Sequence, residues 1–405
     1  MTLPIKSICA KTLLSVTILA SIHSVEMMAD TPFSTLSKKL AAASPELKIS
    51  ELALSSEQAS LKAEVAPADP EMEFEYLWPS TAGELNRWSV GASQEIPDFR
   101  KMNATSKVVK SIDNRKDMER QALEKTTVYE AEQRLIRLIG ARKDLDMLRR
   151  IHENFDSLTV SYNRAWEKGE VTIIDLNKIK IEHARASSAH SQAEGEMAAL
   201  TAEIIALSNG TITQEELATL TDYPVVPDLA DGIDVENAVR QSAQYKSLEA
   251  QSTVASAKVD LASKSRFPRL TLGYVHAYED GNHFNGLSAG MTLPVFSRGS
   301  EKASSVAEQL SIDETNRRQL AEMVAGVEAD IAKQKALAEQ LSMLAPAVDS
   351  TNNFRLLKLA LEGGEISLLD YLQEVSYFVE AAREYNAARL AHALTSSSIA
   401  RYLCR

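Results

Sequence analysis

Glycine, proline and cysteine are all scarce in this chain of 405 residues. It holds 15 glycines, 12 prolines and two cysteines, so few residues interrupt regular helices. One cysteine, Cys9, lies near the start of the chain and the other, Cys404, lies next to its end. Apolar residues nevertheless make up 44% of the sequence, which is enough to bury a substantial core. The composition therefore favours a folded protein built largely from long helices.

Long apolar runs are missing as well. No stretch reaches the ~18 consecutive apolar residues of a membrane-spanning helix, so a mature chain that enters a membrane must do so as a β-barrel. The N-terminus carries Lys6 and Lys11 followed by the apolar segment 13–20, the order of a secretory signal. We expect residues 1–29 to be a signal peptide. Its removal would take Cys9 away, which leaves no internal disulfide and no cysteine metal site.

An excess of basic over acidic residues is also lacking, and so are recognisable catalytic motifs. The formal net charge of −12 argues against nucleic acid as a partner. The sequence contains no Ser/His/Asp grouping, phosphate-binding glycine loop or metalloprotease helix, so we expect no enzyme activity and no cofactor. The histidines are too isolated from each other and from cysteine to specify a metal site, and surface or packing roles are expected for His183, His190, His276 and His283.

An internal repeat organises the rest of the chain. The string KGEVTIIDL at 168–176 is matched by GGEISLLDY at 363–371, an offset of 195. Two further landmarks recur in the same order at offsets of 197 and 198: Pro97 with Pro294, and Pro70 and Tyr76 with Pro268 and Tyr274. These matches predict a duplicated unit, covering 30–208 and 234–405. The segment 209–233 concentrates turn formers and is predicted to be a short linker with room for only a small equatorial domain.

Each unit is predicted to contain a β-hairpin, a long helix, a glycine turn and shorter helices. Residues 71–78 alternate carboxylates with apolar side chains, which is the period of a strand. The hairpins are predicted at 71–96 and 269–293, with strands 71–78, 87–96, 269–278 and 284–293. Long helices are predicted at 98–167 and at 298–362, the second kinked at Pro346, with turns at 168–172 and 363–367. Shorter helices are predicted at 32–66, 172–208, 234–267 and 367–401.

The helix lengths predict a tall cylinder. About 70 residues in one helix span about 105 Å, and two shorter helices stacked end to end match that length. The hairpins would lie at one end and the glycine turns at the other. Four strands cannot close a barrel, but three copies would supply twelve. We therefore predict a mainly α protein with a small β part, assembled as a trimer.

The two repeated strings, beginning at Gly169 and Gly364, resemble the paired periplasmic-tip motifs of TolC-like outer-membrane efflux proteins. The duplicated plan of hairpin and descending helix is similar to that family over nearly the whole mature chain. The resemblance implies a homotrimeric twelve-stranded barrel among outer-membrane lipids, joined to an α-helical barrel in the periplasm. It further implies a passive exit duct whose tips dock onto a periplasmic adaptor protein, served by an inner-membrane pump that we expect to be proton-driven.

The candidate site residues follow from this plan. Adaptor contact is assigned by the resemblance to Gly169, Glu170, Gly364 and Glu365. Helix caps at the tips, and a charged gate ring if the tunnel narrows there, are predicted at Thr172, Asp175, Ser367 and Asp370. An aromatic girdle is predicted at Trp78, Trp88, Tyr278 and Phe284, and the barrel lumen at Glu71, Glu73 and Glu75.

Other interpretations stay open from the sequence. The aromatic residues would also suit a sandwich core, and the glutamates a merely solvated strand face. A periplasmic adaptor or coiled-coil structural protein without a barrel is the main alternative function. The substrate class, whether metal ion, drug, other small molecule or protein, cannot be read, because a passive duct takes its cargo from the pump it serves.

Overall fold

A computed structural model describes residues 31–64, 66–80, 86–96, 99–225, 233–264, 269–293, 300–348 and 353–403. The predicted signal peptide at 1–29 lies outside these residues. So do three of the repeat landmarks, Pro97, Pro268 and Pro294.

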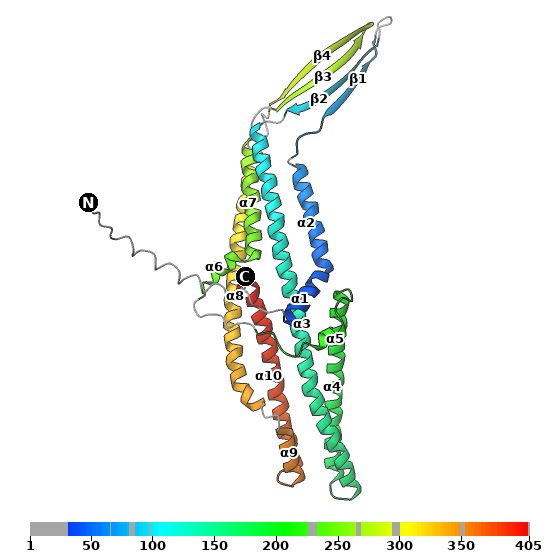
Figure 1. The fold of residues 1–405 in the computed structure, drawn as a ribbon, viewed down its shortest axis with the longest axis vertical. Coiled ribbons are helices and arrows are strands. Elements are labelled where there is room, and N and C mark those ends of the chain that lie inside the picture. Colours follow the sequence, from blue (N-terminus) through cyan, green and yellow to red (C-terminus); the bar gives the residue numbers. More distant parts are fainter. Residues whose placement is uncertain are drawn as a thin grey trace, which may run out of the picture.

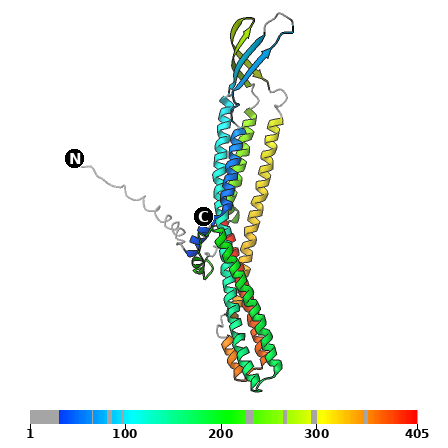
Figure 2. The ribbon, with the colours of Figure 1, turned by 90° about the vertical axis from the view of Figure 1, so that its right-hand side faces the viewer.

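The molecule is a long rod with a sheet at one end and two helical hairpins at the other (Figure 1). Helix α3 (Phe99–Glu167) runs from the sheet to the far tip, and its 69 residues correspond to about 100 Å. In the half nearer the sheet it contacts α2 (Pro45–Glu64) and α7 (Ala243–Lys264). In the other half it contacts α4 (Ile173–Leu207) and α10 (Leu368–Leu403). Figure 2 shows the same stacking of short helices alongside long ones.

No helix in the described part of the chain is both long enough and apolar enough to cross a membrane.

Two of the shorter helices predicted as single are each broken by one residue. The predicted helix 32–66 is divided into α1 (Pro32–Ala43) and α2, because Ser44 precedes Pro45 and is held in an extended conformation. The predicted helix 234–267 is divided into α6 (Val235–Gln241) and α7 at Ser242. The Ser242 hydroxyl donates to the Val239 carbonyl at 2.6 Å and accepts from the Tyr245 amide at 3.2 Å, so it closes one helix and opens the next.

The second long helix is also not a single element. Residues 298–362 were expected to form one kinked helix, but α8 (Ser300–Val348) ends two residues after Pro346, and α9 (Asn353–Glu362) follows as a separate helix. Pro346 lies inside the last turn of α8, where it lacks the amide hydrogen that would bond the preceding turn and its ring crowds that turn.

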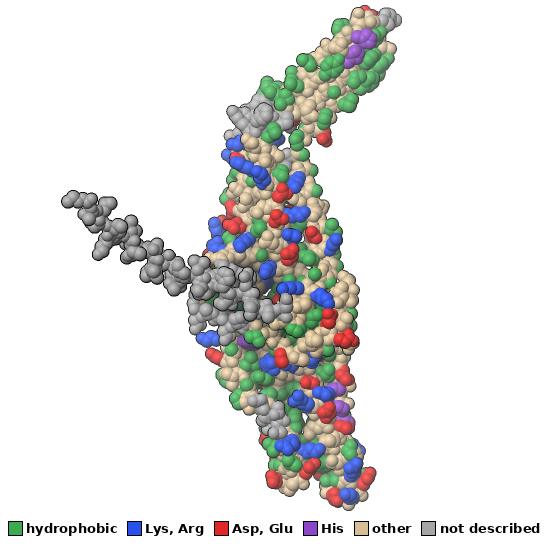
Figure 3. Space-filling model, viewed as in Figure 1, with side chains coloured by type: hydrophobic (Ala, Val, Ile, Leu, Met, Phe, Trp, Pro, Cys, Tyr) green, Lys and Arg blue, Asp and Glu red, His purple; other side chains and the backbone are tan. Residues whose placement is uncertain are grey.

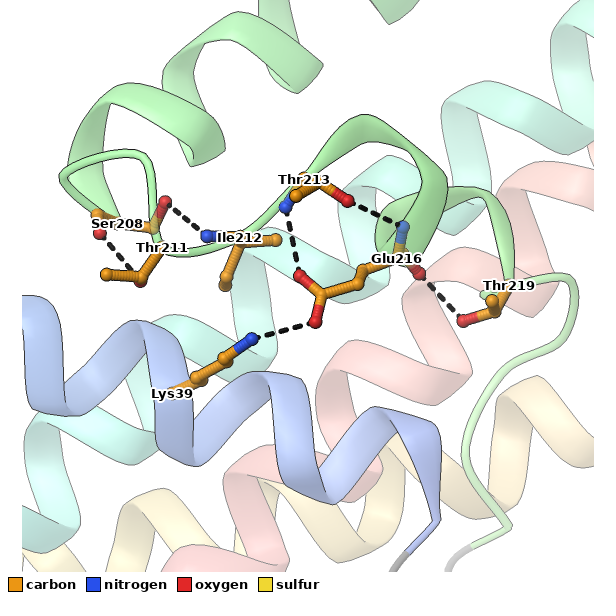
Figure 4. A network of polar contacts seen from close by, with 7 residues as sticks. All are labelled: Lys39, Ser208, Thr211, Ile212, Thr213, Glu216 and Thr219. Carbon is orange, nitrogen blue, oxygen red and sulfur yellow. Dashed lines mark hydrogen bonds and ion pairs between the residues drawn. The ribbon is translucent and has the colours of Figure 1, made fainter.

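The predicted linker contains a helix that the sequence patterns did not indicate. Helix α5 (Gln214–Ala218) begins with a capping box, in which Thr213 and Glu216 exchange backbone-to-side-chain hydrogen bonds (Figure 4). The Glu216 carboxylate also accepts from the Lys39 ammonium of α1 at 2.7 Å, and this bond is the main reason that its pKa lies below the ordinary value. The bond ties α1 to α5 at the middle of the rod.

The residues between α4 and the undescribed part of the linker, 209–225, form what we call the equatorial segment. The Arg142 guanidinium of α3 donates to the backbone carbonyls of Leu217, Ala218 and Leu220 as α5 ends. Burial raises the pKa of Tyr223 to about 12. Apolar residues of α1, α3, α4 and the segment share one core, which includes Phe33, Leu36, Leu135, Ile139, Ile204, Ile212 and Leu217.

A second core joins the helices of the half that is farther from the sheet, which we call the lower half. It follows the heptad seam of α3, in which Phe155 is buried while Leu148 and Tyr162 are partly buried. Ile179 of α4 and Tyr371 of α10 complete it and are fully buried. Because both hairpins of the lower half contribute to one core, the α3–α4 and α9–α10 tips are held side by side.

The sheet is four-stranded and antiparallel throughout, in the order β1–β2–β3–β4. Its strands are β1 (Glu71–Leu77), β2 (Arg87–Ile96), β3 (Arg269–Glu279) and β4 (Asn282–Thr292). Pairing of β2 with β3 joins the hairpins of the two halves. Strands β3 and β4 extend closer to their turn than the predicted 269–278 and 284–293, because Asp280 and Gly281 both adopt positive φ and close a two-residue turn.

Gly273 has a packing role in this sheet. A Cβ at this position would lie 2.8 Å from the Ala92 carbonyl oxygen and 2.9 Å from the Ser93 Cβ. Gly286, on the neighbouring strand, has no atom within 4 Å of such a Cβ.

We therefore expect Gly273→Ala to destabilise the sheet by roughly 1–3 kcal/mol through overpacking, while Gly286→Ala has little effect. Thermal unfolding followed by the fluorescence of Trp78 and Trp88 provides the measurement. Equal melting temperatures for the two variants would contradict this assignment.

Candidate functional site

The first tip is a glycine turn between α3 and α4. Gly169 has φ of +76°, and the amides of Gly169 and Glu170 donate to the carbonyls of Trp166 and Ala165 at 2.9 and 2.8 Å. This pattern closes a helix C-terminus with a left-handed glycine. Helix α4 then starts after Thr172, whose hydroxyl accepts from the Asp175 amide at 3.1 Å.

The second tip repeats this arrangement between α9 and α10. Gly364 has φ of +72°, and the Glu365 amide donates to the Ala360 carbonyl at 2.8 Å. The Ser367 hydroxyl accepts from the Asp370 amide at 3.2 Å, and the Asp370 carboxylate accepts from the Ser367 amide at 3.2 Å. This is a complete capping box.

The two caps differ in two respects. At both tips the aspartate accepts a hydrogen bond from the cap hydroxyl, at 2.7 Å for Asp175 and 2.6 Å for Asp370, but no bond from the Thr172 amide to Asp175 is found among the described residues. The Asp175 carboxylate also pairs with the Lys178 ammonium at 3.2 Å. The Thr172 hydroxyl, assisted by Lys178, holds the pKa of Asp175 below its ordinary value of 3.8.

The tips are connected to each other through polar contacts in the lower core. The Asn154 amide of α3 donates to the Tyr371 hydroxyl of α10 at 2.7 Å, and Lys358 of α9 donates to the Ser157 hydroxyl of α3 at 2.9 Å. Burial raises the pKa of Tyr371 above its ordinary value. A movement of one tip therefore disturbs bonds to the other hairpin.

At the opposite end, the sheet register separates two faces. Residues paired across the strands share a face. What we call the acidic face carries Glu71, Glu73 and Glu75 of β1, and the apolar face carries Met72, Phe74 and Tyr76. The apolar side chains are strongly exposed in the single chain, with Met72 at 81%, Phe74 at 68% and the neighbouring Trp78 at 77%. Figure 3 shows hydrophobic side chains spread over the sheet.

The predicted aromatic girdle is brought together only in part. Trp88 pairs with Tyr278 across β2 and β3, and their rings stack with centroids 5.9 Å apart on the apolar face. Phe284, however, pairs with Ala277 and so lies on the acidic face, which contradicts its assignment to the girdle. The two-residue turn sets this register, and it places His283 instead of Phe284 opposite Tyr278.

The expectation that the histidines are isolated from one another is also wrong. The His276 and His283 rings stack on the apolar face with centroids 5.4 Å apart. In the helices, His152 stacks between His183 and His190 at 5.4 Å from each. The sequence signal for the first pair was the Asp-Gly turn, since a two-residue turn makes His276 and His283 diagonal neighbours. The seven-residue spacing of His183 and His190 signalled a common helix face.

We compared the sequence and the structure with those of known proteins. No family model and no curated protein matches the sequence. Among solved structures, one of CusC, described in connection with transmembrane channel formation, has a TM-score of 0.75 at 14% identity and covers 93% of this chain and 92% of its own. The Campylobacter jejuni CmeC outer membrane channel has a TM-score of 0.74 at 14% identity, with 92% of this chain and 85% of that chain covered. The protein has the fold of the TolC-family outer-membrane channels.

The likeness in fold extends over most of the chain. The Neisseria gonorrhoeae MtrE outer membrane channel, with a TM-score of 0.70 at 14% identity, covers 92% of this chain and 88% of its own. Mainly helical architecture with a small antiparallel sheet, as predicted from the sequence, is confirmed.

The lowered pKa of Asp175 leads to a pH-dependent prediction. A carboxyl with a depressed pKa stabilises the fold above its ordinary value of 3.8, and this contribution is lost as pH falls through the folded pKa. Asp175→Asn should be less stable than the wild type at pH 7, and the difference should shrink below pH 3.8. Urea unfolding at several pH values measures it.

Lys178→Met is the matched control for this experiment. It retains the Thr172 bond, which is the larger cause of the shift, so most of the pH dependence should persist. A pH-independent gap between Asp175→Asn and the wild type would contradict the assignment.

Proposed function

We propose that this protein is the outer-membrane exit duct of a tripartite efflux or export system. It is a homotrimer that passively conducts substrate handed over by an inner-membrane pump and a periplasmic adaptor. The observation that carries the proposal is a sheet with one apolar and one acidic face, mounted on helices about 100 Å long. The names of structures with the same fold, which include outer membrane channels, support it.

The trimer follows from the free edges of the sheet. Strands β1 and β4 are each paired on one side only within the chain. Unpaired backbone groups cost several kcal/mol each in lipid, so β1 of one copy must pair with β4 of the next. Three copies close a barrel of twelve strands, a number within the range of outer-membrane barrels.

The two faces of the sheet fix its orientation in this barrel. The apolar face, with Met72 and Phe74, faces outer-membrane lipid. The acidic face, with Glu71, Glu73 and Glu75, lines a water-filled lumen. The indole and phenol rings of Trp78, Trp88 and Tyr278 lie at the level of the head groups, where amphipathic rings are favoured.

The two tips meet the adaptor in the periplasm. Gly169, Glu170, Gly364 and Glu365 occupy corresponding places in the duplicated unit, 30–208 and 234–405, so each subunit presents two similar turns. Their backbone amides are already bonded within the turns. The adaptor therefore meets the glutamate side chains and the backbone outside those bonds.

Expression of the full-length protein tests the proposal. We expect it in the outer-membrane fraction, with the mass of a trimer in mild detergent, a band whose mobility changes on heating, and stepwise conductance in planar bilayers. A soluble periplasmic monomer would overturn the proposal and favour an adaptor or structural protein.

We further propose that Asp175 and Asp370 contribute to a ring of carboxylates where the tunnel narrows at the tips. Six carboxylates around a threefold axis favour cations. Replacing both by asparagine keeps the side-chain shape and should lower the cation-to-anion permeability ratio, measured by reversal potentials in a salt gradient.

Asp113→Asn is the control, because Asp113 pairs with Lys62 far from the tips. If the Asp175→Asn and Asp370→Asn double variant has the same permeability ratio as the wild type, the carboxylate ring is ruled out.

A further inference from the structure

A polar cluster interrupts the apolar face of the sheet near the β3–β4 turn. It consists of Tyr274, His276, His283 and Asn285, and Figure 3 shows histidines among hydrophobic side chains close to the end of the sheet. The Tyr274 hydroxyl donates to the Asn285 side-chain oxygen at 2.7 Å, and His276 Nδ1 lies 2.8 Å from the same oxygen. His283 Nδ1 lies 3.3 Å from His276 Nε2.

These contacts favour one tautomer of His276. Because an amide oxygen can only accept hydrogen bonds, the contact with Asn285 is a hydrogen bond when His276 carries its proton on Nδ1. In the neutral ring the lone pair is then on Nε2, which faces His283 Nδ1. The cluster therefore presents a fixed imidazole lone pair toward a second imidazole nitrogen.

The separation of the two nitrogens suits one bound metal ion. Imidazole nitrogens bind zinc at about 2.0–2.1 Å in tetrahedral geometry, which puts two of them about 3.3 Å apart. A ligating histidine usually donates its other ring N–H to a carbonyl or carboxylate, which orients the ring. The bond from His276 to Asn285 is of that kind, and Tyr274 in turn orients Asn285.

We propose that His276 Nε2 and His283 Nδ1 chelate a divalent transition-metal ion at the β3–β4 hairpin. The described residues hold no group of three or more His, Cys, Asp or Glu arranged for a metal, so these two imidazoles would be its protein ligands. Imidazole ligands select copper, nickel and zinc over magnesium and calcium.

Binding requires only a tautomer change in His283. In the His283 tautomer that carries its proton on Nε2, the two facing nitrogens, His276 Nε2 and His283 Nδ1, both have a lone pair available for the ion. Neighbouring rings pack against both imidazoles. The ring centroids of Trp88 and His276 are 5.6 Å apart, and those of Tyr278 and His283 are 5.1 Å apart. A bound ion would cross-link β3 to β4.

The other histidine cluster of the described chain lacks this arrangement and provides a control. His152, His183 and His190 stack, but the nearest charged groups to His183 and His190 are the carboxylates of Asp156 and Glu194, at 3.6 and 3.7 Å. His152 Nδ1 and His183 Nε2 are buried without a hydrogen-bond partner among the described residues.

The test uses full-length detergent-purified protein without an added histidine tag. Cu²⁺ titration followed by electron paramagnetic resonance should show one ion per chain with coupling to two nitrogens, and calorimetry should rank affinities as Co²⁺ below Ni²⁺ below Cu²⁺, with Zn²⁺ below Cu²⁺. His276→Gln or His283→Gln should remove the two-nitrogen signal, whereas the His183→Gln and His190→Gln double variant should retain it.

Asn285 provides a second, independent variant. Asn285→Ala should weaken binding about 10-fold or more, because the orienting bond is lost. Asn285→Asp should preserve the affinity, because a carboxylate accepts the same two bonds.

A two-nitrogen signal that survives His276→Gln and His283→Gln together would overturn the proposal, as would the absence of such a signal in the wild type. The site lies within one chain and does not require the channel function. Each variant should keep the mass and heat-modifiable band of the wild type, so failure to bind metal in an intact trimer refutes the metal site alone.

Discussion

The unbroken backbone hydrogen-bond ladder of α3 is the constraint on which the rest of the molecule depends. It fixes the sheet and the first tip about 100 Å apart. A helix of 69 residues is not stabilised by intrinsic propensity alone. Its fully buried residues Leu135, Ile136, Leu138 and Ile139 lie beside α1 and the equatorial segment, at the middle of the rod. The largest buried cluster of α3 therefore lies where the short helices meet end to end.

This constraint explains why breaks in the other helices are tolerated. Ser44 and Ser242 end one helix and allow another to start at the equator, where their neighbours already contact α3 or α8. The equatorial segment is small, but Arg142 and the Lys39–Glu216 pair attach it to both α3 and α1. In the lower half, the contacts of Tyr371 and Lys358 extend the same attachment to α9 and α10. Most short helices thus take their positions from α3, whereas α6 packs on α8.

Local sequence patterns predicted the elements whose formation depends mainly on residues close together in the sequence. Alternation in 71–78 predicted β1, the glycine strings predicted both tip turns, and the absence of proline predicted α3 with its boundaries at most one residue away. The errors arose where the position of a side chain or helix depends on residues far away in the sequence. Phe284 was assigned to the wrong face, because the face depends on the length of a turn. The stacking of His152 on His183 depends on how α3 packs against α4, and the short helix α5 is held by Arg142, 75 residues away from Leu217.

The duplicated tips show how two similar sequences acquire different electrostatics. Asp175 is capped by Thr172 and paired with Lys178, whereas the residue at the corresponding position of the second unit is Gln373, which donates to the Tyr377 hydroxyl instead. Asp370 accordingly forms no ion pair among the described residues, and its carboxylate is bonded only to Ser367. In a threefold assembly, carboxylates paired with an ammonium, from Asp175, would alternate with unpaired carboxylates from Asp370. The second tip would therefore carry the larger share of any field acting on a passing ion, because a neighbouring ammonium reduces the field of the first.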